Sequence, residues 1–124
     1  MTTSSSKKKY TKPLLKAELG HWKTKVKINP SKAFGFLYCI HNQETDQYYW
    51  GKKQFFHGGK KKSKTYGKEM TWRTYTGSSV HLKKDIALIG HDKFTFEIVD
   101  VYKTKGGLYH AEAYCQMISE SMTE

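Results

Sequence analysis

The feature that most constrains the fold is a run of apolar residues followed by a polar turn and a second run rich in aromatic side chains. Residues 34–40 are apolar throughout except for the small Gly35, which is typical of a strand covered on both faces in the middle of a sheet. Residues 41–46 are polar and favour a turn. Because residues 47–53 supply a partner strand, the sequence predicts an antiparallel hairpin.

Further elements are expected from the spacing of apolar residues. Either Ser78 or Ser79 is suited to cap a helix that Gly90 would end. The apolar face of this helix would consist of Leu82, Ile86 and Ile89. A third strand is predicted at residues 93–102, where apolar and polar residues alternate at the start. A short helix is expected after Pro13, on the near-helical spacing of Leu14, Leu15, Leu19 and Trp22.

The length of 124 residues limits the chain to one compact domain with a single core. Residues 1–12 are polar and basic and are expected to form a disordered arm, which leaves residues 13–124 as the domain. Residues 54–76 show no steady period, as is typical of a functional or mobile connection. The predicted fold is therefore α/β, a small three-stranded antiparallel sheet flanked by helices.

Several classes of protein are excluded. The longest apolar run, residues 33–40, is far shorter than the roughly 18 residues of a membrane span, so no membrane partner is expected. The basic start of the chain lacks the apolar region of a secretory signal. Cys39 and Cys115 are too few for a disulfide scaffold, so we expect a reducing cytoplasm. The six histidines fall at no compact spacing and form no zinc signature with these cysteines.

Positive charge is concentrated in the first half of the sequence. Residues 1–68 hold 16 lysines and three acidic residues, a net charge of +13, whereas residues 69–124 have a net charge of −2. Aromatic residues lie among the lysines of residues 48–68. Clustered cations bind polyanions and release their counterions. A nucleic-acid partner is therefore favoured over a lysine-rich surface that only aids solubility.

Glu112 interrupts the apolar face of a helix that is predicted to follow Gly106 and Gly107. The apolar residues of this helix recur every three or four positions, at Leu108, Ala111, Cys115, Ile118 and Met122. Glu112 lies four residues after the first of them and so belongs to the same stripe. A carboxylate there is costly to bury unless it meets a cation or a metal. The alternative is a glutamate at the edge of the stripe that reaches water.

Tyr38 and Tyr49 fall on the two strands of the predicted hairpin. If paired residues have numbers that sum to 87, the two tyrosines are directly opposite each other on one face of the sheet. A slip of one residue would move Tyr49 to the other face. Cross-strand aromatic pairs are common structural features, so the pair by itself does not indicate a functional site.

Together these segments resemble the GIY-YIG nuclease superfamily. The two name-giving motifs correspond to residues 36–38, Phe-Leu-Tyr, and to residues 49–51, Tyr-Trp-Gly. The resemblance continues through residues 72–79, then through residues 90–94, and ends around Glu112. The lysine-rich insert and the Trp-Arg-Thr-Tyr element after the second motif are most similar to the phage-type, homing-endonuclease-like branch.

The chain departs from the family pattern at three points. Phe36 and Leu37 replace the glycine and isoleucine of the first motif, and Trp50 replaces the isoleucine of the second. The helical arginine that family members often carry soon after the second motif has no counterpart in residues 54–68. Arg73 is the only arginine in the sequence, and an arginine binds phosphate in a bidentate manner that lysine cannot reproduce. We therefore assign the arginine role to Arg73, with Lys53 or His57 as residues that could share or replace it.

The resemblance implies hydrolysis of DNA phosphodiester bonds that depends on Mg²⁺ or Mn²⁺. Glu112 would hold a single metal ion, Tyr38 would accept the proton of the attacking water, and Tyr49 would orient water or phosphate. Nearby lysines and the metal would favour the phenolate of Tyr38. Arg73 would stabilise the phosphate in the transition state. The flanking nucleic-acid backbone would be bound by Lys52, Lys60, Lys61, Lys62, Lys64 and Ser78.

Double-stranded DNA is the expected partner, and the place of action would be the host cytoplasm if the chain is encoded by a phage. Double-strand cleavage would require two active sites, which a homodimer on DNA would provide. A different hypothesis is a catalytically silent nucleic-acid-binding protein on the same scaffold, which the altered first motif and the displaced arginine favour.

Overall fold

The computed structural model describes residues 10–58, 62 and 64–121. For residues 119–121 the description covers the backbone alone. Four strands form one sheet in the order β1-β4-β2-β3. The strands are β1 (Trp22–Thr24), β2 (Gly35–Asn42), β3 (Gln47–Gln54) and β4 (Phe94–Tyr102). The helices are α1 (Val80–Ile89) and α2 (Lys105–Ser121), and short 3-10 turns lie at Lys16–Glu18, Pro30–Lys32, Trp72–Thr74 and His91–Lys93.

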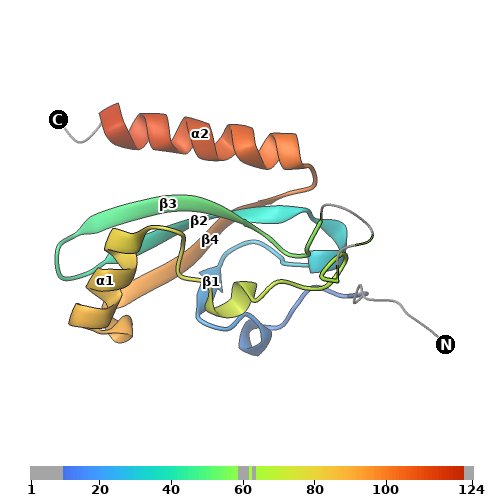
Figure 1. Cartoon of the computed structure of the whole chain (residues 1–124), viewed down its shortest axis with the longest axis horizontal. Helices are drawn as coiled ribbons and strands as arrows, with labels where there is room; N and C mark the ends of the chain where they lie inside the picture. The colour runs from blue at the N-terminus through green and yellow to red at the C-terminus, as the bar shows by residue number, and fades with distance from the viewer. Residues whose placement is uncertain (1–9, 59–61, 63, 122–124) are drawn as a thin grey trace.

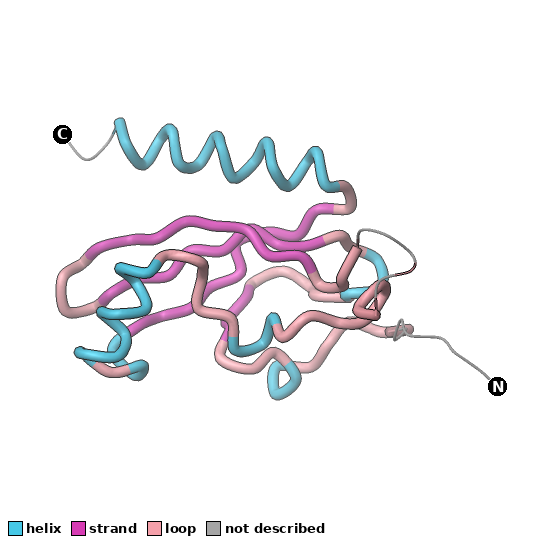
Figure 2. The backbone as a smooth tube through the Cα atoms, in the orientation of Figure 1, coloured by secondary structure: helices cyan, strands magenta, loops and turns pink. Residues whose placement is uncertain are grey.

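The sheet separates two layers, with α2 along one face and α1 with the irregular segments along the other (Figures 1 and 2). Successive side chains of β2 point to opposite faces of the sheet, so this strand contacts both layers. Phe36, Tyr38 and Ile40 belong to the main core together with Leu82 of α1. The intervening residues of β2 point to the opposite face, where Leu108 of α2 is 1% exposed. A strand that is apolar on both faces is thus covered on both, as its sequence indicates.

The prediction of a three-stranded antiparallel sheet was wrong, because β1 adds a fourth strand that runs parallel to β4. Trp22 pairs with Phe96 in this added strand and is 3% exposed. The helix expected after Pro13 is only the turn Lys16–Glu18. Gly20 follows it with a φ of +66°, a conformation that glycine adopts easily. Burial of the Trp22 ring in the core therefore prevails over the weak helical spacing of its neighbours.

The hairpin forms as predicted, but its register differs from the predicted one by two residues. Tyr38 pairs with Gly51, and Tyr49 pairs with Ile40. The strand extends to Asn42, whose side-chain oxygen accepts bonds from the amides of the next turn at 3.0 and 3.3 Å. This Asx turn shortens the loop relative to the expected one. Because a shift of two residues preserves the face, both tyrosines still lie on the α1 side of the sheet.

Both long helices confirm their predicted positions. The Ser79 hydroxyl caps α1 by accepting a bond from the Leu82 amide at 3.2 Å, and Gly90 ends the helix with a φ of +112°. The last helix begins at Lys105, slightly before the expected start. Met122 of its predicted stripe lies outside the described residues. No helix in the described part of the chain combines the length and apolar character that a membrane span requires.

The connection between β3 and α1 is anchored in the core at two points. Phe55 and Trp72 are both fully buried, and Phe56 forms an isolated bridge with Glu69. Of the amino-terminal arm, residues 1–9 lie outside the described residues, while the Tyr10 amide donates a hydrogen bond to the Ser31 hydroxyl. The long segment thus carries its own side-chain anchors although its sequence has no period.

The half-buried His21, which directly precedes β1, contacts the segment before α1 and the exposed His91 that follows α1. The His21 ring stacks on Phe96 with centroids 3.8 Å apart. Its Nε2 lies 2.9 Å from the Tyr75 carbonyl oxygen, and its Nδ1 lies 3.0 Å from Nε2 of His91. Because a carbonyl only accepts, Nε2 carries the hydrogen and Nδ1 accepts from His91. Burial, with a further contribution from His91, lowers the pKa of His21 to about 4.

This lowered pKa predicts a loss of stability on acidification. Below the ordinary pKa of 6.5 the unfolded chain binds a proton that folded His21 does not take up until about pH 4. The free energy of unfolding should therefore fall as the pH drops through this window. Thermal denaturation between pH 7.5 and 4.5 should show a smaller decrease for His21→Gln than for the wild type. The exposed control His110→Gln should follow the wild type, and an equal slope for all three proteins would contradict the prediction.

Candidate functional site

A hollow of about 620 Å³ follows the outer edge of β3, the strand that closes the sheet. Its walls come from β2 and β3, from the segment that precedes α1, and from α2 on the other side of the sheet. The charged and phenolic side chains of the lining are five tyrosines, two lysines and one glutamate, namely Tyr38, Tyr48, Tyr49, Tyr75, Tyr109, Lys52, Lys53 and Glu112.

 Trp50 also lines the hollow. The hollow thus gathers side chains from both faces of the sheet at its open edge.

Tyr38 reaches the hollow through the space that two glycines leave open. It is 5% exposed, and its ring lies across Gly51, the residue opposite it on β3. A Cβ atom on Gly51 would overlap the ring and its hydroxyl, and one on Gly77 would lie 3.1 Å from the hydroxyl oxygen. The glycine of the second motif is therefore required by the close approach of the Tyr38 side chain.

The surroundings of the two motif tyrosines keep both phenols protonated. Burial raises the pKa of Tyr38, and the neighbouring Tyr75 and the charge of Glu112 raise it further. Burial also raises the pKa of Tyr49, whose hydroxyl donates to Asp85 of α1 at 3.3 Å. In the chain alone, burial outweighs any effect of the nearby lysines, so the Tyr38 phenol is a hydrogen-bond donor.

Glu112 reaches the hollow from α2, on the face of the sheet opposite the tyrosines. Its Oε1 lies 2.8 Å from the Lys52 ammonium, and its Oε2 accepts a bond of 3.4 Å from the Gln116 amide. The carboxyl side chain is 19% exposed. Of the alternatives that the sequence left open, a cation partner is realised, and that cation is a lysine on β3.

The residues around Glu112 fit a metal site with one protein carboxylate. Among the described residues, no group of three or more His, Cys, Asp or Glu side chains is placed to hold a metal ion. Glu112 is the only carboxylate in the described lining of the hollow. Mg²⁺ keeps several waters and is commonly bound by one or two carboxylates together with substrate phosphates. The donor set thus suits Mg²⁺ or Mn²⁺ shared with a phosphate and does not suit a site made of protein ligands alone.

Lys53 supplies a cation inside the hollow. Its ammonium lies over the Tyr75 ring, 4.2 Å from the centroid, and burial lowers its pKa. Lys52, the preceding residue, points to the other face, where its ammonium also lies 4.3 Å from the centroid of Tyr109. Successive residues of one strand therefore place one ammonium on each side of the sheet edge.

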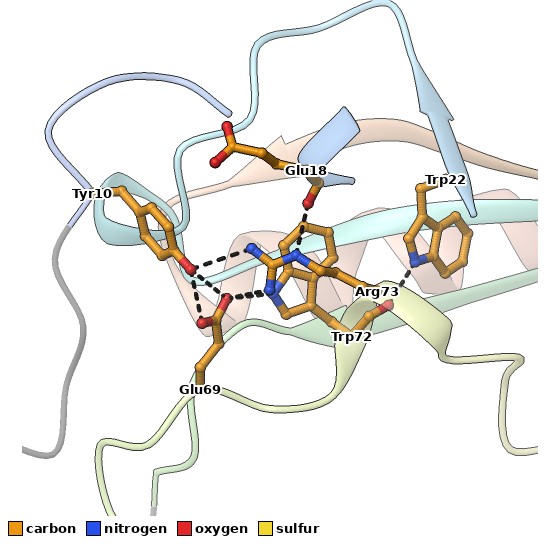
Figure 3. Close-up of polar contacts among 6 residues, drawn as sticks. All are labelled: Tyr10, Glu18, Trp22, Glu69, Trp72 and Arg73. Atoms are coloured by element: carbon orange, nitrogen blue, oxygen red, sulfur yellow. Dashed lines mark hydrogen bonds and ion pairs between the residues drawn. The ribbon is translucent and has the colours of Figure 1, made fainter. Parts of the chain in front are cut away.

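Arg73, to which the sequence analysis assigned the arginine role, is not among the residues that line the hollow. Figure 3 shows its guanidinium among Tyr10, Glu69 and the backbone of Glu18, over the ring of Trp72. It donates to the Glu18 carbonyl at 2.7 Å, to Glu69 at 3.0 Å and to the Tyr10 hydroxyl at 3.2 Å. The fork of donors that suits a phosphate is thus used to join three segments of the chain.

Glu69 is the centre of this network. Its carboxylate accepts bonds from the Tyr10 hydroxyl at 2.8 and 3.0 Å and from the Trp72 indole at 2.8 Å. Burial opposes its charge, but the bonds from Trp72 and Tyr10 and the charge of Arg73 together lower the pKa of Glu69. The segment that contains Trp72 is also held by β1, because the Trp22 indole donates a hydrogen bond to the Trp72 carbonyl at 2.6 Å (Figure 3). The network holds the segment before α1 against the start of the domain.

A structural role predicts that Arg73→Lys loses stability and keeps activity. Lysine retains the charge but cannot form the three bonds, so we expect the free energy of unfolding to fall by about 2 kcal/mol. Denaturant unfolding measures this change. The DNA cleavage that the family resemblance implies should, below the melting temperature, be close to that of the wild type. A variant that unfolds like the wild type but lacks this cleavage would instead assign Arg73 a role in the chemistry of the hollow.

The other predicted residues are divided between the hollow and the surface. Ser78 lines the hollow, and the adjacent serine takes the capping role. His57 does not line it, and its backbone bonds to Lys68 and Gly67. Lys62 and Lys64 are exposed, while Lys60 and Lys61 lie outside the described residues.

Sequence reasoning gave no role to Tyr75, although its side chain contacts both Tyr38 and Lys53. The tyrosine follows a buried tryptophan in a segment without a period, so no spacing pattern singles it out. Its proximity to Arg73 in sequence, within the Trp-Arg-Thr-Tyr element, was the available signal. The element contributes to the hollow through its tyrosine and not through its arginine.

Comparison with known proteins gives one match. The family model described as "Putative endonuclease segE, GIY-YIG domain" matches residues 20–124. The matched range begins just before β1 and includes every residue that lines the hollow. Searches of curated proteins and of solved structures gave no match.

Proposed function

Because the chain belongs to the GIY-YIG endonuclease family of the segE type, we propose that it is a metal-dependent DNA endonuclease whose active site is the hollow beside β3. The family is one of nucleases, so the substrate class is nucleic acid.

One observation carries the proposal. The tyrosines of both family motifs, the Lys53 ammonium and the Glu112 carboxylate line a single hollow, although Glu112 belongs to a helix on the opposite face of the sheet. A phosphodiester bound there would meet a cation and hydrogen-bond donors on one side and a carboxylate on the other. This combination suits phosphoryl transfer, in which charge on the phosphate must be stabilised.

The proposed chemistry assigns a separate task to each of these side chains. Glu112 would hold Mg²⁺ or Mn²⁺, which would supply a Lewis acid for the phosphate and compensate the carboxylate charge. Burial is the main cause of the raised pKa of Tyr38, so Tyr38 would first lose its own proton to solvent and then, as the phenolate, accept the proton of the attacking water. Tyr49 would orient the water or the phosphate. Lys53 would stabilise the phosphate charge in the role expected of an arginine. Lys52 would leave Glu112 and pair with the nucleic-acid backbone.

Contacts outside the hollow complete the proposed interface. Lys62 and Lys64 are exposed in the connection that follows β3. With Lys60 and Lys61, and with Ser78 at the wall of the hollow, they would bind the flanking phosphates. Double-stranded DNA is the proposed partner because these residues would bind backbone without reading bases. Cleavage of both strands would require a second site, which a homodimer on DNA would bring.

A catalytically silent DNA-binding protein is the second candidate, favoured by the ion pair between Lys52 and Glu112. In this function the lysine permanently neutralises the carboxylate, and Tyr38 stays a protonated core residue. Both candidates bind DNA, so binding alone does not distinguish them.

A plasmid assay separates the two candidates. The full chain is incubated with supercoiled plasmid in Mg²⁺, in Mn²⁺ and in EDTA, and binding is measured in parallel by mobility shift in EDTA. A nuclease converts the plasmid to nicked or linear forms only when a divalent cation is present. Retarded but uncut plasmid in both metals would contradict the nuclease and support the silent binder.

A further inference from the structure

Tyr75 contacts two side chains of the proposed site at once. Its ring lies edge-on to the Tyr38 ring, with the centroids 6.0 Å apart and the planes at 76°. The Lys53 ammonium lies 4.2 Å from the same centroid. An ammonium at this distance is attracted by the ring face. One residue thus stands between the proposed proton acceptor and the proposed phosphate-binding cation.

The backbone of Tyr75 is fixed from two directions. Its amide donates to the Trp72 carbonyl at 3.3 Å, and Trp72 is fully buried. Its own carbonyl accepts the bond of 2.9 Å from the neutral His21 ring, which is stacked on Phe96 of β4. Neither Trp72 nor His21 lines the hollow, so these anchors of Tyr75 do not depend on a ligand bound there.

We propose that Tyr75 is a positioning residue of this site, whose ring holds the Lys53 ammonium and whose hydroxyl orients the Tyr38 phenol toward the same phosphate. The proposal rests on the proposed nuclease function. Tyr75 itself transfers no proton and binds no metal in it. Without the ring, the flexible side chain of Lys53 would spend most of its time in other rotamers.

Two substitutions separate the two contacts. Tyr75→Phe keeps the ring face for Lys53 and removes only the hydroxyl beside Tyr38. Tyr75→Leu removes both. The matched controls are Tyr114→Phe and Tyr114→Leu, because Tyr114 lies on α2 outside the lining of the hollow and is 56% exposed. Thermal denaturation of each variant establishes that it is folded at the assay temperature.

Cleavage kinetics provide the first measurement. We expect Tyr75→Leu to reduce the single-turnover rate about 10-fold, as loss of a desolvated cation–π contact allows. In the Lys53→Met background, Tyr75→Leu should cleave no more slowly than Tyr75→Phe, because both variants lack the hydroxyl and the ring acts through Lys53. A further loss for Tyr75→Leu in this background would overturn the proposal, as would a rate for Tyr75→Leu equal to that of the controls.

The pH profile reports the second contact. Burial raises the pKa of Tyr38 most, and the neighbouring Tyr75 hydroxyl raises it further. Removal of this hydroxyl in Tyr75→Phe should therefore shift the limb of the pH profile on which the cleavage rate rises with pH to lower pH. Tyr114→Phe should leave the limb in place. An unmoved limb in Tyr75→Phe would contradict the orienting role of the hydroxyl.

A measurement without substrate keeps the proposal separate from the nuclease function. The ring face of Tyr75 should shift the ε-methylene proton resonances of Lys53 upfield in the NMR spectrum. This shift should persist in Tyr75→Phe and disappear in Tyr75→Leu. If the wild type shows the shift but cuts no DNA in Mg²⁺ or Mn²⁺, the nuclease function fails while the contact stands. A resonance that is unshifted in the wild type overturns the positioning role whatever the activity.

Discussion

Glu112→Gln should bind DNA like the wild type and cleave it at least about 100-fold more slowly, because it removes the charge that would hold a metal ion worth several kcal/mol in the transition state. The amide has the size of the carboxylate and retains an oxygen that can accept the bond from Lys52, which spans 2.8 Å in the wild type. The loss should therefore arise from charge and not from packing. The rate at which supercoiled plasmid disappears in Mg²⁺ measures it.

A matched substitution controls for the loss of one negative charge. Glu44→Gln changes the exposed turn of the hairpin, away from the lining of the hollow, and should cleave like the wild type. Mobility shifts in EDTA should show equal or slightly tighter binding for Glu112→Gln, since the substitution removes repulsion of phosphate. Cleavage by Glu112→Gln at the rate of the control would remove Glu112 from the active site.

Gly51→Ala should be nearly as damaging to cleavage as the loss of the glutamate. The added methyl group would overlap the Tyr38 ring and hydroxyl. The Tyr38 side chain is buried in the core, so the ring cannot move aside without displacing its neighbours. We expect a stability loss of about 1–3 kcal/mol, as for overpacked cores, and a misplaced phenol that lowers the rate at least about 100-fold, as small displacements of a reacting group do.

Gly58→Ala is the control for this substitution. A Cβ atom there would meet only the Gln54 amide, at 3.9 Å, so stability and cleavage should match the wild type. Circular dichroism melts and plasmid assays of the two variants separate a packing effect from an effect on chemistry. If Gly51→Ala cleaves at the rate of Gly58→Ala, the close approach of Tyr38 to β3 does not matter for the reaction.

Local patterns predicted the elements of this fold better than they predicted its long-range pairings. The hairpin, the capped helix α1 and the stripe of α2 each depend on residues that are close in sequence, and all three form. Strand β1 is too short for a period, and its place in the sheet depends on the pairing of Trp22 with Phe96. The hairpin register depends on the Asn42 side chain, which turns the chain earlier than its polar neighbours suggest.

The candidate site shows the same division. Glu112 was recognisable because a carboxylate in an apolar stripe breaks a local pattern. Arg73 was assigned by its rarity, but its location depends on Glu69, on Tyr10 and on the carbonyl of Glu18, which no spacing relates to it. Tyr75 is important only because folding brings it to Lys53 and Tyr38. Partners that are distant in sequence therefore decided which residues share the hollow.

The position of β3 at the border of the sheet has a consequence for solubility. A border strand offers unpaired amide and carbonyl groups to any other chain, and native proteins block such pairing with charged residues, lysine above all. Lys52 and Lys53 occupy consecutive positions of β3 and project to opposite faces. The side chains that the proposed chemistry uses on phosphate would thus also discourage the strand from seeding aggregates.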